Sequence, residues 1–345
     1  MLLAVVLNAL AGALIPVQTA INSRLSGRLG AILPASLVSF AVGSAGLGLA
    51  VLATGTSVPW AETARTQPWW IWVGGACGLV FLTLNIVLLP RIGAAATVVL
   101  PLVGQVLAGL VIDLFGAFDT DVRPLTVVRA IGGVLVIVGA ALVNLVGRRV
   151  VPAPDAEPGD TDLAGTDIPD AEHPDAELPD AGPPASDPAA TTATITPTHS
   201  RPHLVLWVVG VLAGSLGAVQ TAVNGRLTEV MGSGLASALV SFLVGTAGLV
   251  LINVATRQRI RRVTGVRPWM LLGGLLGATF VLANAVNAPR LGTSLAVSAA
   301  LLGQVLMGLV VDHNGHFGIA RRPVTALRLA GAALVVLGVA LVRSG

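Results

Sequence analysis

The sequence predicts an all-α membrane protein with ten transmembrane helices, arranged as two five-helix repeats of inverted orientation. Three observations carry this prediction: an apolar composition, a series of apolar tracts long enough to cross a bilayer, and a duplication that relates the two halves of the chain. Of the 345 residues, 54% are hydrophobic and 11% are charged, whereas soluble domains carry charge on about a quarter of their residues. So few charged residues could not cover the surface of a soluble protein of this length.

Five apolar tracts occur in the first half of the chain, and each is near the roughly 20 residues that cross a hydrocarbon core about 30 Å thick. They are Met1 to Ile21, Ala31 to Leu52, Trp69 to Leu89, Gly93 to Val111 and Leu125 to Val146. All are apolar on every side and lack the period of two of membrane β-strands, so we expect helices. The first tract has neither a basic segment before it nor a small-residue cleavage site after it, and we expect it to be retained as a helix.

The second half of the chain repeats the first. The segment Gln18–Leu25 recurs as Gln220–Leu227 at an offset of 202 residues, and beyond a small deletion the offset becomes 199. Identical residues at the second offset include Gly74, Asn85, Gly104, Gln105, Asp113 and Arg129, which meet Gly273, Asn284, Gly303, Gln304, Asp312 and Arg328. Chance cannot produce such a match over five consecutive tracts, so the sequence indicates an internal repeat.

The two repeats are joined by a polar segment. Residues 150–200 contain eleven acidic residues and no arginine, with many proline, alanine and threonine residues between them. Such a segment cannot bury enough apolar surface to offset the entropy of ordering, so we expect a disordered linker. The predicted domains are a first membrane repeat over 1–149, a linker over 150–202 and a second membrane repeat over 203–345.

The number of helices in each repeat determines the predicted orientation. Five is odd, so a linker that stays on one side of the membrane makes the second repeat insert upside down relative to the first. Arginines test this arrangement, because cytoplasmic loops are rich in them. Those assigned to the linker side are Arg24, Arg28, Arg91, Arg148, Arg149, Arg201, Arg257, Arg259, Arg261, Arg262, Arg267, Arg321 and Arg322, against Arg65, Arg123, Arg226, Arg290 and Arg343 on the other. This distribution predicts a cytoplasmic linker and both termini outside.

The repeated motifs resemble a known family. They are Gln-x-x-x-Asn-x-x-Leu from Gln18, Ser-Phe-x-x-Gly from Ser39, a tryptophan-rich entry into the third tract, Gly-Gly-x-x-Gly from Gly74, Gly-Gln at Gly104 and Asp-x-x-Gly from Asp113. This pattern resembles the YdcZ-type branch of the drug/metabolite transporter (DMT) superfamily, and each half is similar to one complete unit. The resemblance implies a ten-helix bundle of inverted repeats with a central substrate path. Ten-helix relatives commonly keep their termini inside, whereas the arginines of this chain predict them outside.

Amide side chains within the apolar tracts are candidates for that substrate path, because polar groups are costly in lipid. Those that we single out are Gln18, Asn22, Asn85, Gln105 and their repeat equivalents Gln220, Asn224, Asn284 and Gln304. Gln18 and Asn22 lie four residues apart and so share one helix face. The alternative is that these amides only form hydrogen bonds between helices, each contributing about 0.6 kcal/mol.

Each repeat also contains an aspartate and an arginine that we expect on the same side of the membrane. Asp113 and Asp312 close the fourth and ninth predicted helices, and Arg129 and Arg328 lie about a turn inside the fifth and tenth. Each pair is either a structural ion pair at the membrane interface or an anion-binding group. No Asp, Glu or His lies deep within a predicted helix, which disfavours proton-coupled export of cations and favours a neutral or zwitterionic solute.

Three functional classes remain open at this stage. We expect a small-molecule transporter. The chain is rich in alanine and has no lysine, a composition that indicates a high-GC bacterial genome and therefore a location in the plasma membrane. A non-transporting membrane scaffold or receptor would have no need for mid-membrane amides such as Gln105, and a membrane enzyme would need a nucleophile, a metal site or paired carboxylates. We expect no catalytic residues, metal or cofactor, and the partners are a small solute and the lipid bilayer. The pI near 10.7 does not indicate binding to nucleic acid, because all basic residues are arginine and the net charge is only +3. The predicted assembly is a monomer or a homodimer.

Overall fold

The computed structural model describes residues 1–145, 203–257, 266–315 and 323–345, in which every regular element is a helix. The predicted linker lies outside the described residues. Both hydrophobic halves belong to one compact unit. The all-α fold predicted from the sequence is confirmed.

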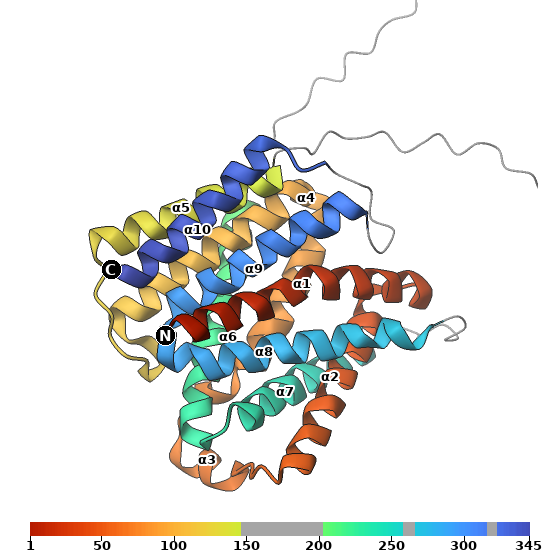
Figure 1. Ribbon diagram of the computed structural model, residues 1–345. Coiled ribbons are helices and arrows are strands. Elements are labelled where there is room, and N and C mark those ends of the chain that lie inside the picture. The colour runs from red at the N-terminus through yellow and green to blue at the C-terminus, as the bar shows by residue number, and fades with distance from the viewer. Residues whose placement is uncertain (146–202, 258–265, 316–322) are drawn as a thin grey trace, which may run out of the picture. The chain divides into compact units, whose positions relative to one another are not determined.

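The first half contains α1 (Leu2–Leu29), α2 (Ile32–Thr54), the short α3 (Trp60–Thr66), the long α4 (Gly74–Phe115) and α5 (Val127–Leu145). The second half contains α6 (His203–Met231), α7 (Gly234–Ala255), α8 (Leu272–Leu291), α9 (Thr293–Asn314) and α10 (Ala326–Ser344) (Figure 1). Short 3-10 turns, Trp69–Trp72 and Pro268–Leu271, lead into α4 and α8, and another, Ala117–Asp119, follows α4. Equivalent tracts of the two halves therefore form equivalent helices.

Nine helices in the described part of the chain are long and apolar enough to cross a membrane. Large apolar side chains cover their outer surfaces, for example Leu10, Leu52 and Leu251, which are 61%, 78% and 68% exposed. A soluble protein does not expose apolar surface on this scale, whereas lipid solvates it. The helices therefore form a multi-pass membrane protein, while the predicted number of ten spans stays a prediction.

The sequence predicts two spans where the structure has the single helix α4. With 42 residues, a straight α4 would be about 63 Å long, which is twice the thickness of the hydrocarbon core. Its two ends nevertheless meet, because Trp70 before α4 and Phe118 after it stack edge to face with ring centroids 5.6 Å apart. The helix therefore reverses direction within its length and forms two antiparallel arms, which correspond to α8 and α9 in the second half.

Each half packs on the other through the same contacts. A Cβ atom on Gly104 in α4 would overlap the carbonyl oxygen of Val211 in α6, and one on Gly303 in α9 would overlap that of Ala9 in α1. Gly104 and Gly303 are repeat equivalents, as are Val211 and Ala9. The contact thus occurs twice with the halves exchanged, and glycine is required both times because the helix backbones touch.

Equivalent helices also pack against each other, and they run in opposite directions. Gly132 of α5 lies against Gly338 of α10, while Gly139 lies against Gly331, so residue numbers rise along one helix as they fall along the other. In α2 and α7, Phe40 stacks on its equivalent Phe242 with ring centroids 5.0 Å apart. Antiparallel pairing of equivalent helices is the relation that an inverted repeat requires.

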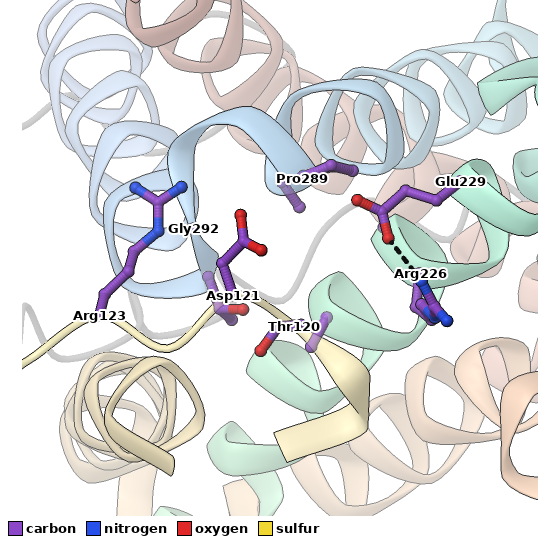
Figure 2. A pocket seen from close by; sticks show the side chains of 11 residues that line it. Thr120, Asp121, Arg123, Arg226, Glu229, Pro289 and Gly292 are labelled. Carbon is purple, nitrogen blue, oxygen red and sulfur yellow. Dashed lines mark hydrogen bonds and ion pairs between the residues drawn. The ribbon is translucent and has the colours of Figure 1, made fainter. Parts of the chain in front are cut away.

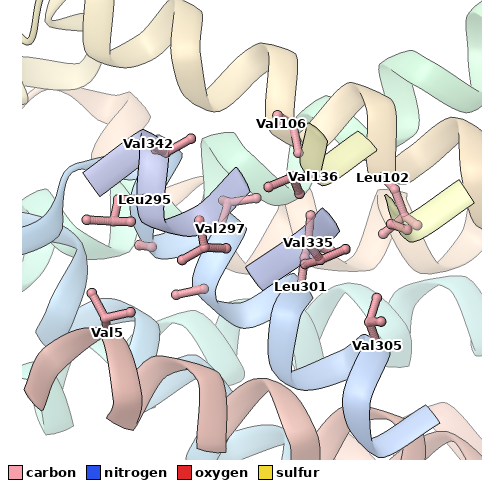
Figure 3. Close-up of a cluster of buried hydrophobic side chains, with 14 of the residues drawn as sticks. Val5, Leu102, Val106, Val136, Leu295, Val297, Leu301, Val305, Val335 and Val342 are labelled. Carbon is pink, nitrogen blue, oxygen red and sulfur yellow. The ribbon is translucent and has the colours of Figure 1, made fainter. Parts of the chain in front are cut away.

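The largest apolar core is built from both halves. Val106 of α4, Val136 of α5, Leu301 of α9 and Val335 of α10 are completely or almost completely buried in one cluster, together with Val5 of α1 (Figure 3). The faces of α5 and α10 opposite to this core carry exposed valine and leucine. Contact between the halves, rather than packing within one half, therefore holds these four helices together.

Breaking the Phe40–Phe242 stack tests the contact between α2 and α7. A double-mutant cycle with Phe40→Leu and Phe242→Leu is expected to give a coupling energy of about 0.5–1.5 kcal/mol, the usual value for an aromatic pair. The free energy of unfolding in micelles, followed by tryptophan fluorescence, measures it. As a control, Phe40→Leu and Phe115→Leu are expected to be additive, since Phe115 is 73% exposed at the end of α4; a coupling of zero for the first pair contradicts the contact.

Candidate functional site

A cavity of about 470 Å³ lies between α1, the second arm of α4, α5, α9 and α10. The residues lining it on α1 and α9 are Ile15, Pro16, Thr19, Ala20, Ser23, Arg24, Leu301, Gln304, Val305, Gly308, Val311 and Asp312. Val98, Leu102, Val143, Asn144 and Arg328 complete the wall. Its volume lies within the range of about 300–1,000 Å³ that is typical of small-molecule sites.

The cavity is reached from the end of the bundle at which α5 ends and α10 begins, which we call the open end. Thr19, Ser23 and Arg24 are exposed there, and Asp312 has a side chain that is 24% exposed. Arg328 at the start of α10 donates through Nη2 to Asp312 Oδ2 and through Nε to the carbonyl oxygen of Val143. The ion pair that the sequence places in the second repeat therefore lines the cavity.

The equivalent pair at the opposite end of the bundle, which we call the sealed end, is enclosed. Asp113 is fully buried and Arg129 is 5% exposed. Arg129 Nη2 donates to Asp113 Oδ2 at 2.8 Å and to Ser294 Oγ at 2.7 Å. Asp113 also accepts hydrogen bonds from the backbone N–H of Thr293 at 2.7 Å and of Ser294 at 3.1 Å, and from the Ser294 hydroxyl at 2.6 Å.

These bonds explain how the first repeat holds the second. Thr293 and Ser294 begin α9, so their N–H groups have no partner within the helix and need a cap. Asp113 supplies that cap from the other repeat, with a negative charge at the positive end of the helix dipole. The sequence predicts the Asp113–Arg129 pair, but nothing local in it reveals that Ser294 completes the site.

Arg123 of the first repeat stabilises the break between α8 and α9. Gly292 has φ 80° and ψ 163°, a backbone conformation that side chains rarely adopt, and a Cβ atom there would lie 2.7 Å from Arg123 Nε. Arg123 donates through Nη1 to the carbonyl oxygen of Leu291 at 2.8 Å and through Nη2 to that of Arg290 at 3.2 Å. The last carbonyl groups of α8 are thereby satisfied by the first repeat.

A much smaller pocket marks the sealed end. It has a volume of about 20 Å³, roughly the space for one water molecule. Arg226 pairs with Glu229 at 3.2 Å and lies 3.8 Å from Asp119, and Asp121 points into the space between Arg123 and Glu229 (Figure 2). Charged side chains thus close this end, where the open end has a cavity.

A pair of equivalent glycines shows the difference between the ends most directly. A Cβ atom on Gly109 in α4 would lie 3.0 Å from the Cα atom of Ser294, whereas Gly308 in α9 lines the cavity and has nothing within 4 Å of the same position. The two glycines are repeat equivalents, so the same helix face is packed at the sealed end and free at the open end.

The predicted amides occupy three kinds of environment. Gln304 lines the cavity. Gln18, Asn22, Gln220, Asn224 and Gln105 pack instead on glycines of the opposite half, against Gly277, Gly273, Gly78, Gly74 and Gly217 respectively. Asn284 is buried and accepts from Asn8 Nδ2 at 3.2 Å, while the side chain of Asn85 lies outside the described residues. Of the seven predicted amides whose side chains the structure describes, one, Gln304, therefore lines the cavity.

Sequence reasoning missed a buried amide cluster. Asn8 of α1 is fully buried and donates through Nδ2 to the carbonyl oxygen of Ala296 at 2.6 Å, besides its bond to Asn284. Asn287 donates to Asn8 Oδ1 at 3.5 Å. The signal was present as a single asparagine in the apolar run of α1, but its repeat equivalent is Gly210, so the comparison of the halves did not reveal it. The cluster joins α1, α8 and α9.

A helical membrane bundle with a polar cavity open at one end and closed by ion pairs at the other belongs to the class of membrane transporters. Comparison with known proteins is consistent with that class. The chain belongs to the YdcZ family, whose family model is described as "Putative inner membrane exporter, YdcZ" and matches residues 3–142 and 205–341. The matched segments are the two repeats, so the resemblance noted from the motifs is confirmed and the protein is a multi-pass cell membrane protein.

One relative supports this assignment, and one solved structure shares the fold. Inner membrane protein YdcZ of Escherichia coli (strain K12) is 29% identical over 135 residues, which cover 38% of this chain and 90% of that protein. That relative therefore corresponds to one of the two repeats. A solved structure described as "Crystal structure of protein" matches with a TM-score of 0.60 and 18% identity, covering 98% of this chain and 94% of the other; at this identity, the likeness concerns the fold alone.

Proposed function

We propose that this protein moves a small neutral or zwitterionic solute across the membrane by alternating access, with the cavity as the substrate site. One observation carries the proposal: the two ends of the bundle are built from equivalent residues but are in opposite states. Gly109 packs on Ser294 at the sealed end, and Gly308 faces an open cavity. If the two repeats exchange conformations, the open end closes and the sealed end opens.

The chain also contains a reason for one state to be favoured. Ser294 and its hydroxyl complete the seal around Asp113, whereas the repeat equivalent of Ser294 is Ala95. A hydrogen bond to a charged group contributes about 1.5–3 kcal/mol, so a seal formed at the open end lacks one such bond. We expect the state with the cavity open to be the more populated one in the absence of substrate.

The direction of the open end follows from the arginines. If the linker side is cytoplasmic, as the positive-inside rule predicts, the cavity opens to the cytoplasm and both termini lie outside. An inward-open resting state suits export, the activity in the description of the YdcZ family. The same assignment makes the end closed by Asp113 the outer gate.

The charges in the cavity support an uncharged or zwitterionic solute. Asp312 is paired with Arg328, and Arg24 also lies in the lining, so the described lining offers a cation no carboxylate without an arginine partner. Gln304, Thr19 and Ser23 add neutral polar groups, and Leu102 and Leu301 add apolar surface. A polar solute of metabolite size matches this lining.

Gln304→Ala is expected to lower flux at least tenfold while the protein stays folded, because it removes the amide that lines the cavity. Uptake and efflux of a pooled metabolite mixture in proteoliposomes measure this. Gln18→Ala is the matched control: Gln18 packs on Gly277 outside the cavity, and we expect its flux to be retained. Equal losses in the two variants contradict the assignment of the cavity, and an absence of flux for every solute in the folded wild type leads to the scaffold or receptor alternative.

A further inference from the structure

The two Asp–Arg pairs differ in how completely their hydrogen bonds are satisfied. Around Asp113, the carboxylate accepts from Arg129, from two backbone N–H groups and from a hydroxyl. The other terminal nitrogen of that arginine, Nη1, donates to the carbonyl oxygens of Arg123 at 3.0 Å and Pro124 at 2.9 Å. N–H and O–H donors thus surround the carboxylate, and two carbonyl oxygens accept from Arg129 Nη1.

The second pair has few such partners. Within the described part of the chain, Asp312 accepts only from Arg328 Nη2, although it lines a polar cavity. Arg328 is 4% exposed, and its Nη1 is buried without a hydrogen-bond partner. A buried, unpaired N–H of a charged group is costly, so an acceptor is missing beside Nη1, while the Asp312 carboxylate, 24% exposed in the cavity, is free to accept from further donors.

The sequence explains why the donors around Asp113 have no equivalent at Asp312. Thr293 and Ser294, which cap on Asp113, have Ala94 and Ala95 as repeat equivalents, and Ala95 has no hydroxyl. Those alanines also lie within α4, and not at the start of a separate helix as Thr293 and Ser294 do in α9. The donors of the first pair have no counterpart in this state.

We propose that the Asp312–Arg328 pair is a recognition site for the ammonium and carboxylate groups of a zwitterionic amino acid. The carboxylate of the solute takes the place that carbonyl oxygens hold beside Arg129 and accepts from Arg328 Nη1. The ammonium group takes the place of the N–H and O–H donors around Asp113 and donates to Asp312. The inference rests on the proposed function and names its substrate class.

Both charged groups of the solute are needed for this match. An amine without a carboxylate leaves Arg328 Nη1 unpaired, and a carboxylic acid without an ammonium group leaves Asp312 without added donors. The remainder of an amino acid then faces Gln304 and the apolar wall formed by Leu102 and Leu301. Charge-assisted bonds of this kind discriminate strongly, because an analogue that lacks the carboxylate leaves the buried Nη1 of Arg328 without an acceptor.

Protection of a cavity thiol tests the proposal on the full-length protein. Ser23, which is exposed in the cavity, is replaced by cysteine in a Cys77→Ala background, and its rate of maleimide labelling is measured in nanodiscs. A mixture of the neutral L-amino acids at 10 mM total is expected to slow labelling at least fivefold. The matching decarboxylated amines and deaminated acids at the same concentration are expected to leave the rate unchanged.

Variants of the pair provide the second arm of the test. Arg328→Lys retains the positive charge but has no Nη1 group, and Asp312→Asn retains the shape but not the charge; both are expected to abolish protection, while their unfolding midpoints verify that they are folded. Protection by amines or acids alone, by no amino acid, or to the wild-type degree in either variant overturns the substrate class. Flux of a different solute through proteoliposomes would then leave the transporter proposal standing, whereas absence of all flux would remove it.

Discussion

Asp113→Asn is expected to lower the free energy of unfolding by about 3–5 kcal/mol, the usual cost of removing one partner of a buried ion pair. The substitution leaves Arg129, which is 5% exposed, without a counter-ion. It also weakens the cap on Thr293 and Ser294, which start α9. Denaturant unfolding in micelles, followed by tryptophan fluorescence, measures the loss.

The matched control is Asp312→Asn in the second repeat. Its carboxylate is 24% exposed and caps no helix among the described residues, so the substitution removes fewer hydrogen bonds than Asp113→Asn does. Arg328 is as buried as Arg129 and still loses its counter-ion, so we expect a loss of about 1–3 kcal/mol, smaller than that of Asp113→Asn. Equal losses in the two variants contradict the assignment of one pair to the seal and the other to the cavity. If Asp113→Asn/Arg129→Ala is no less stable than Asp113→Asn, the first pair acts as one structural unit.

Gly109→Val is expected to open the sealed end. A Cβ atom at Gly109 would lie 3.0 Å from the backbone of Ser294, and overpacking of this kind costs about 1–3 kcal/mol. Because that cost falls on the sealed state and not on a state in which α4 and α9 have separated here, the equilibrium shifts. Each 1.4 kcal/mol is about tenfold in population. Labelling of Ala222→Cys, a residue that is 1% exposed beside the small pocket, should become at least about fivefold faster in a Cys77→Ala background.

Gly308→Val is the control on the equivalent face of α9. No atom lies within 4 Å of a Cβ at Gly308, so the added side chain enters the cavity without a clash. We expect the labelling of Ala222→Cys to be unchanged in this variant, and the flux to fall because the cavity is filled and its closure is obstructed. Faster labelling of Ala222→Cys in Gly308→Val, or no acceleration in Gly109→Val, contradicts the alternating-access proposal.

Much of the fold follows from local properties of the sequence. Apolar tracts of about 20 residues predict helices wherever they occur, and the two offsets of 202 and 199 residues align the contacts that the structure shows twice. The sequence predicts a boundary between the third and fourth spans of each half. In the second half, α8 and α9 separate at Gly292, whereas in the first half a single helix, α4, covers both spans and turns back within its length. In the second half the break coincides with a positive φ angle, which the equivalent Gly93 alone does not predict.

The candidate site was only partly accessible to sequence reasoning. The pairing of Asp113 with Arg129 and of Asp312 with Arg328 follows from their spacing, and both ion pairs are present. The role of Ser294 does not follow from spacing, because it lies 181 positions from Asp113. The amides were harder to place for the same reason: Gln18 and Gln304 are equally polar, and only the helix opposite each of them decides that one packs on a glycine and the other lines a cavity.

The sequence by itself determined that this is a helical membrane protein of two homologous halves, because hydrophobic length and internal identity are properties of the chain alone. Only the tertiary structure decided which end is closed. The residues at the two ends are similar, as Gly109 and Gly308 show, and the difference that favours one closed end, Ser294 against Ala95, has a meaning only once Ser294 is seen to bond to Asp113. The two ends differ because packing depends on contacts between segments that lie far apart in the chain. In this conformation, α4 and α9 are in close contact at the sealed end, whereas the equivalent helix face borders the cavity at the open end.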